Sequence, residues 1–249
     1  LLSFHEEEPS LVPSPGVNYG SAAAQQFGVP GAMASAETAM IARDIALALD
    51  TGARVLFQHV SSAQSAALIR AGKALGAKIY AEVTPHHISL TEDDVPAHGT
   101  YARMNPPLRK EADRQALIEA LADGTIDMIA TDHAPHTAEE KAREFAKAPS
   151  GITGLETAFS VCNTYLVKTG KLSPMQLIEK MSKAPAEVYG LTGRAVAAGN
   201  FARLVLLEWD SEVIYKKYKS KAINTPYTDM PLKNAPHALV AGTRVTARS

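Results

Sequence analysis

The sequence predicts an α/β fold in which parallel strands alternate with helices. Short segments rich in β-branched and aromatic residues alternate with longer segments of helical periodicity, in the order β-α-β-α-β-α-β from Leu1 to Asp132. Such alternation is typical of a parallel sheet whose strands are joined by helical crossovers. A closed barrel and a doubly wound open sheet both fit this pattern.

Four segments are predicted strands. The opening segment "LLSFHEEEPS" is the first, and apolar runs over Arg54–Val60 and Lys78–Val83 are the second and third. The fourth predicted strand, Thr125–Asp132, follows a helix that comes after a loop with two consecutive prolines, Pro106 and Pro107. We therefore expect four parallel strands in chain order.

The segments between the strands have the apolar periodicity of helices. Ser61 and Gln64 are spaced as a capping box, which predicts a helix that starts there and ends at Gly76. Gly124 predicts the end of another helix in the same way. Gly124 ends the predicted helix over 110–124. The remaining predicted helices span 35–52, 154–167 and 174–181.

The composition is that of a globular protein with a sizeable core. The 249 residues are 46% hydrophobic and 20% charged, and 25 Lys and Arg stand against 26 Asp and Glu. This balance, without a run of like charges, argues against binding to nucleic acid or to an anionic membrane. The single cysteine, Cys162, excludes an internal disulfide, and we interpret it as a small buried residue. With no apolar stretch of membrane-spanning length, we expect a cytoplasmic protein. Because the first residue is Leu1 inside a predicted strand, we also expect a fragment.

Histidine and aspartate recur where the predicted strands end. His5 follows the first strand, His59 is near the end of the second, "TPHH" follows the third and Asp132 ends the fourth. Carboxyl ends of parallel strands share one rim, where barrel enzymes build their sites. Neutral imidazole and carboxylate are ligands for Zn²⁺ and similar ions, which activate water near neutral pH. Asp132 could accept the proton and pass it to a leaving group, and His136 could hold a substrate carboxylate or carbonyl.

Five motifs carry a resemblance to a known family. In chain order they are "FQHVSS", "AEVTPHHISLTEDD", "MNPPLR", "IATDHAPHT" and "APSGITGLETAF". Together they resemble the second half of a class I dihydroorotase of the amidohydrolase superfamily. The resemblance implies strands five to eight of a metal-dependent (β/α)8 barrel, TIM-like, together with part of a small β-rich domain. We expect residues 1–191 in the partial barrel and residues 192–249 in the small domain.

The resemblance also implies an activity and a set of site residues. The reaction is the reversible cyclisation of N-carbamoyl-L-aspartate to L-dihydroorotate in pyrimidine biosynthesis, with two Zn²⁺ ions in the full-length enzyme. His5 and His59 match metal ligands, and Asp132 matches the residue that binds metal and acts as general acid and base. The matches to substrate-binding positions are Asn105, His136, Ser150 and Gly151.

Other histidines are given different interpretations. We interpret His86 and His87 as structural, and His133 as a residue that supports the site without binding metal. The family's first-strand His-x-His pair, its Arg and its bridging ligand have no counterpart here, and no His-x-His occurs in the chain.

Two classes of alternative remain open. Other cyclic amidases, allantoinase or dihydropyrimidinase, share the barrel and the metals. A non-catalytic dihydroorotase-like scaffold for a partner enzyme is the second class, although inactive relatives usually lose ligands, and His5, His59 and Asp132 are all kept. The resemblance implies a homodimer and makes aspartate carbamoyltransferase the candidate partner.

Overall fold

A four-stranded parallel sheet forms the centre of the computed structural model, which describes residues 1–191, 196–234 and 236–247. The strands lie in chain order and each pairs in parallel with the next, as the sequence predicts. Their carboxyl ends therefore meet at one edge of the sheet. The strands are β1 (Leu2–Phe4), β2 (Val55–Phe57), β3 (Ile79–Val83) and β4 (Met128–Ile129).

The strands are shorter than the sequence predicts, and this places two site residues on loops. Of the predicted strand Arg54–Val60, only the three residues of β2 are a strand in the structure. Of the predicted strand Thr125–Asp132, only the two residues of β4 are. His59 has a φ of 35° and Asp132 has a φ of 48°, in the left-handed region that no strand adopts. Each residue therefore lies just past a strand end, where the chain turns.

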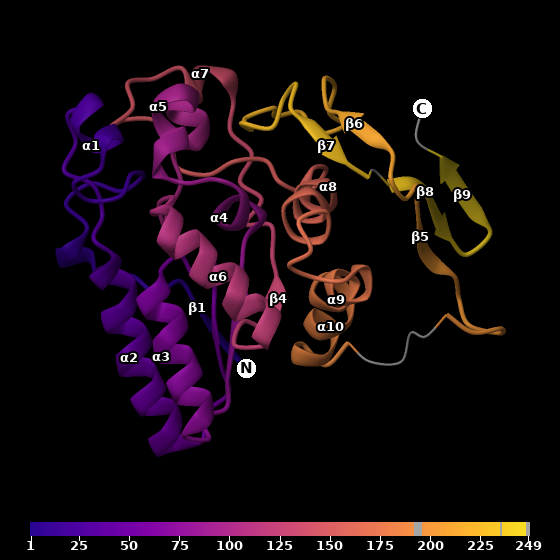
Figure 1. Cartoon of the computed structure of the whole chain (residues 1–249), viewed down its shortest axis with the longest axis horizontal. Coiled ribbons are helices and arrows are strands. Elements are labelled where there is room, and N and C mark those ends of the chain that lie inside the picture. The colour runs from indigo at the N-terminus through magenta and orange to yellow at the C-terminus, as the bar shows by residue number, and fades with distance from the viewer. Residues whose placement is uncertain (192–195, 235, 248–249) are drawn as a thin grey trace.

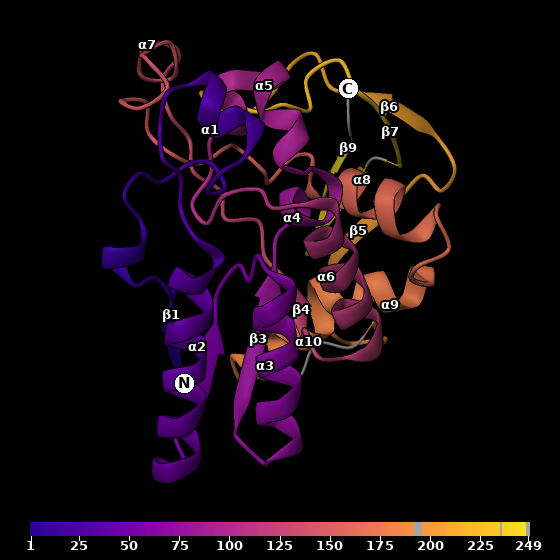
Figure 2. The ribbon, with the colours of Figure 1, turned by 60° about the vertical axis from the view of Figure 1, so that its left-hand side comes forward.

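Three long helices cover one face of the sheet, with α3 between α2 and α6 (Figures 1 and 2). Their apolar sides pack on the buried strands, and all three residues of β2 are buried. The helices span Ala34–Thr51 (α2), Ala63–Ala74 (α3) and Glu111–Asp123 (α6). The core between helices and sheet contains Ile41, Ile45, Phe57, Ile69, Ile79, Val83, Leu117 and Leu121.

The ends of these helices follow the sequence signals with one exception. Gly124 adopts the left-handed conformation that ends α6, and Gly76, with a φ of 90°, follows the last turn of α3. The predicted capping box at Ser61 is wrong. The cap of α3 is Ser62, whose hydroxyl accepts the N–H of Ser65. Ser61 is displaced from this role because it binds a carboxylate of α2, described below.

Short helices fill the loops beyond the carboxyl edge. In both views α1, α5 and α7 lie at the same end of the molecule (Figures 1 and 2). Their bounds are Ala22–Gln26 (α1), Pro85–Ser89 (α4), Val95–His98 (α5) and Ala138–Lys141 (α7), with 3₁₀ turns at Pro9–Leu11, Glu92–Asp94 and Gly99–Ala102.

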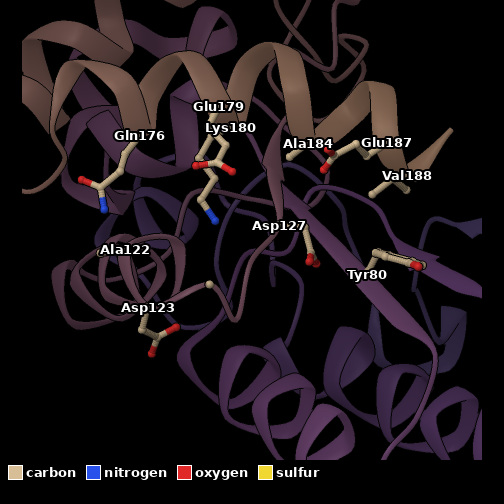
Figure 3. Close-up of a pocket in the computed structure, with 11 residues that line it drawn as sticks. Tyr80, Ala122, Asp123, Asp127, Gln176, Glu179, Lys180, Ala184, Glu187 and Val188 are labelled. Atoms are coloured by element: carbon tan, nitrogen blue, oxygen red, sulfur yellow. The ribbon is translucent and has the colours of Figure 1, made fainter. Parts of the chain in front are cut away.

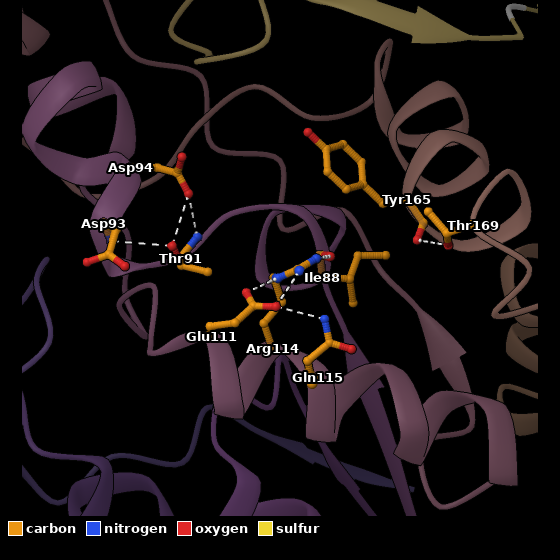
Figure 4. A network of polar contacts seen from close by, with 9 residues as sticks. All are labelled: Ile88, Thr91, Asp93, Asp94, Glu111, Arg114, Gln115, Tyr165 and Thr169. Atoms are coloured by element: carbon orange, nitrogen blue, oxygen red, sulfur yellow. Dashed lines mark hydrogen bonds and ion pairs between the residues drawn. The ribbon is translucent and has the colours of Figure 1, made fainter.

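Arg114 fastens α4, which carries the "TPHH" histidines, to α6. Its guanidinium donates to the carbonyl of Ile88 at 3.2 Å, and Glu111 holds the guanidinium by two contacts of 2.6 Å (Figure 4). A charged donor thus satisfies a carbonyl near the carboxyl end of α4, where helix carbonyls lack partners.

The region after the sheet contains interrupted helices. The predicted helix over 154–167 begins as α8 at Ala158–Cys162 and continues as a π-helical turn, Asn163–Val167. The predicted helix over 174–181 runs as α9 (Pro174–Ile178), a π turn (Glu179–Lys183) and α10 (Ala184–Val188). Cys162 is fully buried, as interpreted from the sequence, and burial raises the pKa of its thiol.

Antiparallel strands make up the β-rich part. One sheet has the order β5-β8-β9, and β6 pairs with β7 (Figure 1). The expected domain boundary at residue 192 lies outside the described residues. No helix in the described part of the chain is long and apolar enough to cross a membrane. The strands span Arg203–Leu207 (β5), Glu212–Ile214 (β6), Pro231–Lys233 (β7), Pro236–Ala241 (β8) and Arg244–Ala247 (β9).

Candidate active site

His5 and His59 meet at the carboxyl edge of the sheet. They follow β1 and β2, which are hydrogen-bonded neighbours, and His5 Nδ1 lies 2.9 Å from His59 Nε2. Two nitrogens bound tetrahedrally to one zinc ion, each about 2 Å from it, are roughly 3.3 Å apart. The two rings therefore stand close to the spacing of a ligand pair. Burial, reinforced by His5, lowers the pKa of His59 and favours the neutral, ligating form of its imidazole.

Two carboxylates accompany this pair. Asp132 is exposed on the loop after β4, and Glu82 is buried on β3 and accepts a hydrogen bond from the backbone of His59. Burial raises the pKa of Glu82 to about 7, and the charge of Asp132 contributes to the rise. Asp132 also raises the pKa of His59, which opposes the effect of burial. The charge of Asp132 therefore acts on both Glu82 and His59. We call this group, at the ends of all four strands, the strand-end site: His5, His59, Glu82 and Asp132.

The donor chemistry of the strand-end site fits a divalent metal in part. Two imidazole nitrogens converge, and a carboxylate lies near enough to act electrostatically on one of them. Among the described residues, no three His, Cys, Asp or Glu side chains converge closely enough to hold an ion alone. His5 and His59 are thus brought together as predicted, whereas Asp132 stands apart from the pair.

Asn105 lies beside this site through Glu7. The Glu7 carboxylate accepts from Asn105 Nδ2 at 2.8 Å and lies 3.4 Å from His5 Nε2. Asn105 Oδ1 is buried and has no hydrogen-bond partner in the described part of the chain. A buried acceptor without a donor is costly, so this atom is suited to receive an N–H from a ligand.

The interpretation of His87 as structural agrees with its contacts. Its Nδ1 lies 2.7 Å from the hydroxyl of Thr84 and its Nε2 lies 3.1 Å from the carbonyl of Pro106. Burial lowers the pKa of His87 to about 3, so the ring is neutral and both nitrogens are engaged. His87 thereby fixes the carbonyl that follows Asn105. His86 is buried beside it, and burial lowers its pKa as well.

A buried ion network stands behind His59. The Glu37 carboxylate of α2 accepts both the N–H and the hydroxyl of Ser61, and also the N–H of Ser62. Arg109, the last residue of "NPPLR", donates to the same Ser61 hydroxyl and to the carbonyl of Ala32. This network links the two motifs that carry His59 and Asn105, and it explains why Ser61 does not cap α3.

The predicted substrate residues on the later loops lie together. His136 Nε2 is 2.9 Å from the carbonyl of Ser150, and Ala134 N–H donates to the carbonyl of Ile152. Gly151 has a φ of 106°, and a Cβ there would lie 2.5 Å from the Cβ of Ala134. Only glycine allows the two segments to approach so closely. His133 supports the same contact, because its Nδ1 accepts the N–H of Gly154 at 3.1 Å.

Two buried cations hold the 149–151 segment from the other side. Lys141 Nζ donates to the carbonyls of Pro149 and Gly151 at 2.9 and 2.8 Å, and Lys141 is only 2% exposed. Arg103 donates to the Ser150 hydroxyl, and its carbonyl accepts the N–H of Gly151. Burial lowers the pKa of Lys141 to about 8. The side-chain amide of Asn224 joins this segment to residues 134–136, because its Nδ2 donates to the carbonyls of both Ala134 and Gly151. We call the whole set the loop clamp: Arg103, His136, Lys141, Gly151 and Asn224.

Two pockets differ in where they lie relative to the strand-end site and the loop clamp. One of about 610 Å³ adjoins the loop clamp and is lined by His136, Tyr101 and Asn224 among others. Another, of about 510 Å³, lies by Asp127 and Gly124, which precede β4, and is therefore at the opposite end of that strand from Asp132. Figure 3 shows Asp127 and Lys180 there, and Lys180 donates to a backbone carbonyl. The first pocket is the one next to the predicted substrate residues.

Sequence reasoning missed several members of the two groups. Glu82 had a usable signal, because a carboxylate inside an apolar strand must face polar groups or water. Glu7 had a weaker signal, which was its position two residues after the predicted metal ligand His5. Lys141 and Asn224 carried none, because their partners lie in loops whose course the sequence does not specify.

The chain resembles known proteins along most of its length. Residues 23–244 match the model of the amidohydrolase family. The dihydroorotase of Clostridioides difficile is 53% identical over 226 residues, 91% of this chain and 53% of that protein. The dihydroorotase of Clostridium acetobutylicum is 48% identical over 228 residues, 91% of this chain and 54% of that protein. The chain thus spans about half the length of the curated relatives it matches.

Solved structures share the fold. An L-hydantoinase (dihydropyrimidinase) from Arthrobacter aurescens superposes with a TM-score of 0.84 at 26% identity, covering 99% of this chain and 56% of that chain. A D-hydantoinase (dihydropyrimidinase) from Thermus sp. gives a TM-score of 0.78 at 27% identity, over 86% of this chain and 49% of that chain.

Proposed function

Because this chain belongs to the amidohydrolase family, we propose that it provides the carboxyl-terminal half of a dihydroorotase. The enzyme would interconvert L-dihydroorotate and N-carbamoyl-L-aspartate in pyrimidine biosynthesis. The observation that carries this proposal is the convergence of His5 and His59, 2.9 Å apart, at the edge that also holds Asp132 and Asn105. Identity of 45–53% to dihydroorotases supports this substrate over the hydantoin-type substrates of the structural neighbours, which are 26–27% identical.

His5, His59 and Asp132 would hold the metal, which we propose to be zinc, with two ions in the full-length enzyme. When bound, such a metal lowers the pKa of water and polarises a carbonyl. Neutral imidazoles suit this role, and the lowered pKa of His59 keeps that ring neutral. Further ligands beyond those of this chain would complete a binuclear site.

Asp132 would be the general base and acid of the reaction. In the hydrolytic direction, the amide C–N bond of the dihydroorotate ring breaks while a hydroxyl group from water adds to the carbonyl carbon. Asp132 would accept the proton that water loses and deliver it to the departing ring nitrogen. Its exposed position on the loop after β4 leaves the carboxylate accessible to a substrate at that edge.

The substrate would lie between Asn105 and the loop clamp. The unpartnered Asn105 Oδ1 would accept the ring N–H, and His136 would bind the substrate carboxylate. Both main-chain groups of Gly151 are engaged, its N–H by Arg103 and its carbonyl by Lys141. Gly151 would therefore let the loop approach the substrate closely, and Ser150 would contact the substrate through its backbone N–H, since its carbonyl already lies 2.9 Å from His136 Nε2.

We further propose the division into a partial barrel, residues 1–191, and a small β-rich domain, residues 192–249. A homodimer is the proposed assembly, with aspartate carbamoyltransferase as the candidate partner. The main alternative is another cyclic amidase, allantoinase or dihydropyrimidinase. A non-catalytic scaffold is the other alternative, and the retention of His5, His59 and Asp132 argues against it.

The test compares the 249-residue chain with a completed enzyme. Dihydroorotate hydrolysis would be assayed with added Zn²⁺ for the chain alone and for the chain mixed with the N-terminal half of a dihydroorotase. We expect activity from the mixture only, because this chain lacks the first-strand histidines and the bridging ligand that the family uses. Activity of the chain alone would contradict the proposed division of the site. Hydrolysis of hydantoin or allantoin in preference to dihydroorotate by the mixture would favour the alternative amidases.

A further inference from the structure

We propose that Asn224 is a positioning residue that locks the two substrate-contacting loops into one unit. The proposal rests on the function proposed above. Asn224 lies in an irregular segment before β7 and is 2% exposed. Its side chain contacts both the segment that carries His136 and the segment that carries Gly151, which no other buried amide of the described chain does.

Every hydrogen-bonding group of the Asn224 side chain is used. Oδ1 accepts the N–H of His136 at 3.1 Å, and Nδ2 donates to the carbonyls of Ala134 and Gly151 at 3.0 and 3.2 Å. The backbone carbonyl of Asn224 accepts the N–H of Thr153 at 3.0 Å. The contacts also fix the orientation of the amide. A flipped amide would set its oxygen against two carbonyls and its nitrogen against an N–H.

The two joined segments have little freedom to shift without losing contacts. The His136 ring reaches the Ser150 carbonyl at 2.9 Å, and Ala134 approaches Gly151 as closely as glycine permits. Asn224 adds the bond that fixes the main chain of His136 itself. The position of the His136 ring relative to the substrate loop therefore depends on an amide almost ninety residues further along the chain.

The contacts of Asn224 separate substrate positioning from metal binding. Its partners are Ala134, His136, Gly151 and Thr153, and none of them belongs to the strand-end site. Loss of the amide should therefore displace His136 while His5 and His59 keep their places. Misplacement of a binding group by about 1 Å can cost on the order of 100-fold in rate.

The test uses Asn224→Ala and Asn224→Asp in the full-length protein. Asn224→Asp keeps an acceptor for the His136 N–H but removes both donors and sets a carboxylate oxygen against two carbonyls. Asn163→Ala is the matched control, because Asn163 is also a fully buried amide, and its Nδ2 donates to the carbonyl of Lys233, away from both groups. Steady-state kinetics with dihydroorotate, bound zinc, the urea midpoint and hydrogen exchange of the His136 amide would be measured for each.

We expect both Asn224 variants to raise KM severalfold and to lower kcat/KM by up to about tenfold, the effect of losing the His136 contact itself. Exchange of the His136 amide should become faster, and bound zinc should stay unchanged. Asn163→Ala should lower the urea midpoint and leave KM within twofold. If Asn224→Asp behaves like wild type, or if Asn163→Ala raises KM as much, the positioning role is refuted. A wild-type enzyme without activity on dihydroorotate would instead refute the proposed function. In that case hydrogen exchange still tests the positioning role, which unchanged exchange of the His136 amide in Asn224→Ala would refute.

Discussion

The strand-end site and the loop clamp are built from opposite kinds of polar contact. In the strand-end site, titratable groups face one another. His5 Nδ1 lies 2.9 Å from His59 Nε2, and the charge of Asp132 contributes to the raised pKa of the buried Glu82 carboxyl. In the loop clamp, donors meet backbone carbonyls, as Lys141 and Asn224 both do at Gly151. Groups that perturb each other's pKa suit proton transfer and ligand exchange. Saturated hydrogen bonds suit fixed geometry.

This contrast predicts that the two regions fail differently when mutated. Substitutions of His5 and Asp132 in the strand-end site should remove chemistry and leave the fold, because these two side chains are exposed. Substitutions in the loop clamp should weaken both the fold and substrate binding, because its donors satisfy buried carbonyls.

The largest effect is expected for Asp132→Asn in the full-length enzyme. The amide keeps the shape of the carboxylate but cannot accept a proton, so turnover should fall by at least the ~10² to 10⁴ typical of general acid-base groups. The urea midpoint should stay within error of wild type, because Asp132 is exposed. Turnover within a few-fold of wild type would remove Asp132 from the proposed role.

The next effect is expected for Lys141→Met, measured by urea unfolding of the full-length protein. Methionine fills the space of the lysine stem but leaves the carbonyl of Pro149 without its donor and the carbonyl of Gly151 with Asn224 alone. An unsatisfied buried group costs about 1–3 kcal/mol, so we expect a loss of up to about 3 kcal/mol together with a raised KM. Lys147→Met is the control, because Lys147 is exposed and its ion pair is with the exposed Glu144, and it should change stability by less than about 0.5 kcal/mol. Equal effects in the two variants would show that the buried donor does not hold the loop.

A pH-dependent effect of about 2 kcal/mol is expected from Glu82. Its pKa is raised by burial from 4.5 to about 7, so between these values the folded protein binds a proton that the unfolded chain has released. The free energy of unfolding should therefore fall as pH rises from 5 to 7 and then level off. In metal-free protein, wild type should lose about 2 kcal/mol more than Glu82→Gln between pH 5 and pH 8. Parallel pH profiles for the two proteins would mean that Glu82 is ionised in the folded state.

The sequence was informative about the strand-end site because strand ends are local features. Apolar runs located β1 to β4, and parallel pairing then brought His5 and His59 to one edge. Strand lengths were overestimated because the chain turns at His59 and Asp132, where φ is positive. His and Asp adopt this conformation more often than most non-glycine residues do, but too rarely for the residue type alone to predict a strand end.

The loop clamp was only half predictable. The resemblance of the motifs identified two of its members, His136 and Gly151, together with Ser150, which precedes Gly151. Asn224 is 88 residues from His136, and their contact depends on the course of an irregular segment. The capping box at Ser61 failed for a similar reason, because the distant Glu37 on α2 binds the Ser61 hydroxyl. Local rules cannot predict which distant carboxylate or amide reaches a polar side chain.

The smallest effect distinguishes the two sides of the proposed substrate, through Asn105→Ala and His136→Ala in the full-length enzyme. Asn105 is tied to the strand-end site through Glu7, whereas His136 belongs to the loop clamp. Each variant loses one substrate hydrogen bond, so KM should rise and kcat/KM should fall about tenfold, the equivalent of about 1.4 kcal/mol. Bound zinc, measured by atomic absorption, should stay unchanged in both variants. If His136→Ala instead loses zinc, His136 is a metal ligand, and the division between a strand-end site that binds metal and a loop clamp that positions substrate is wrong.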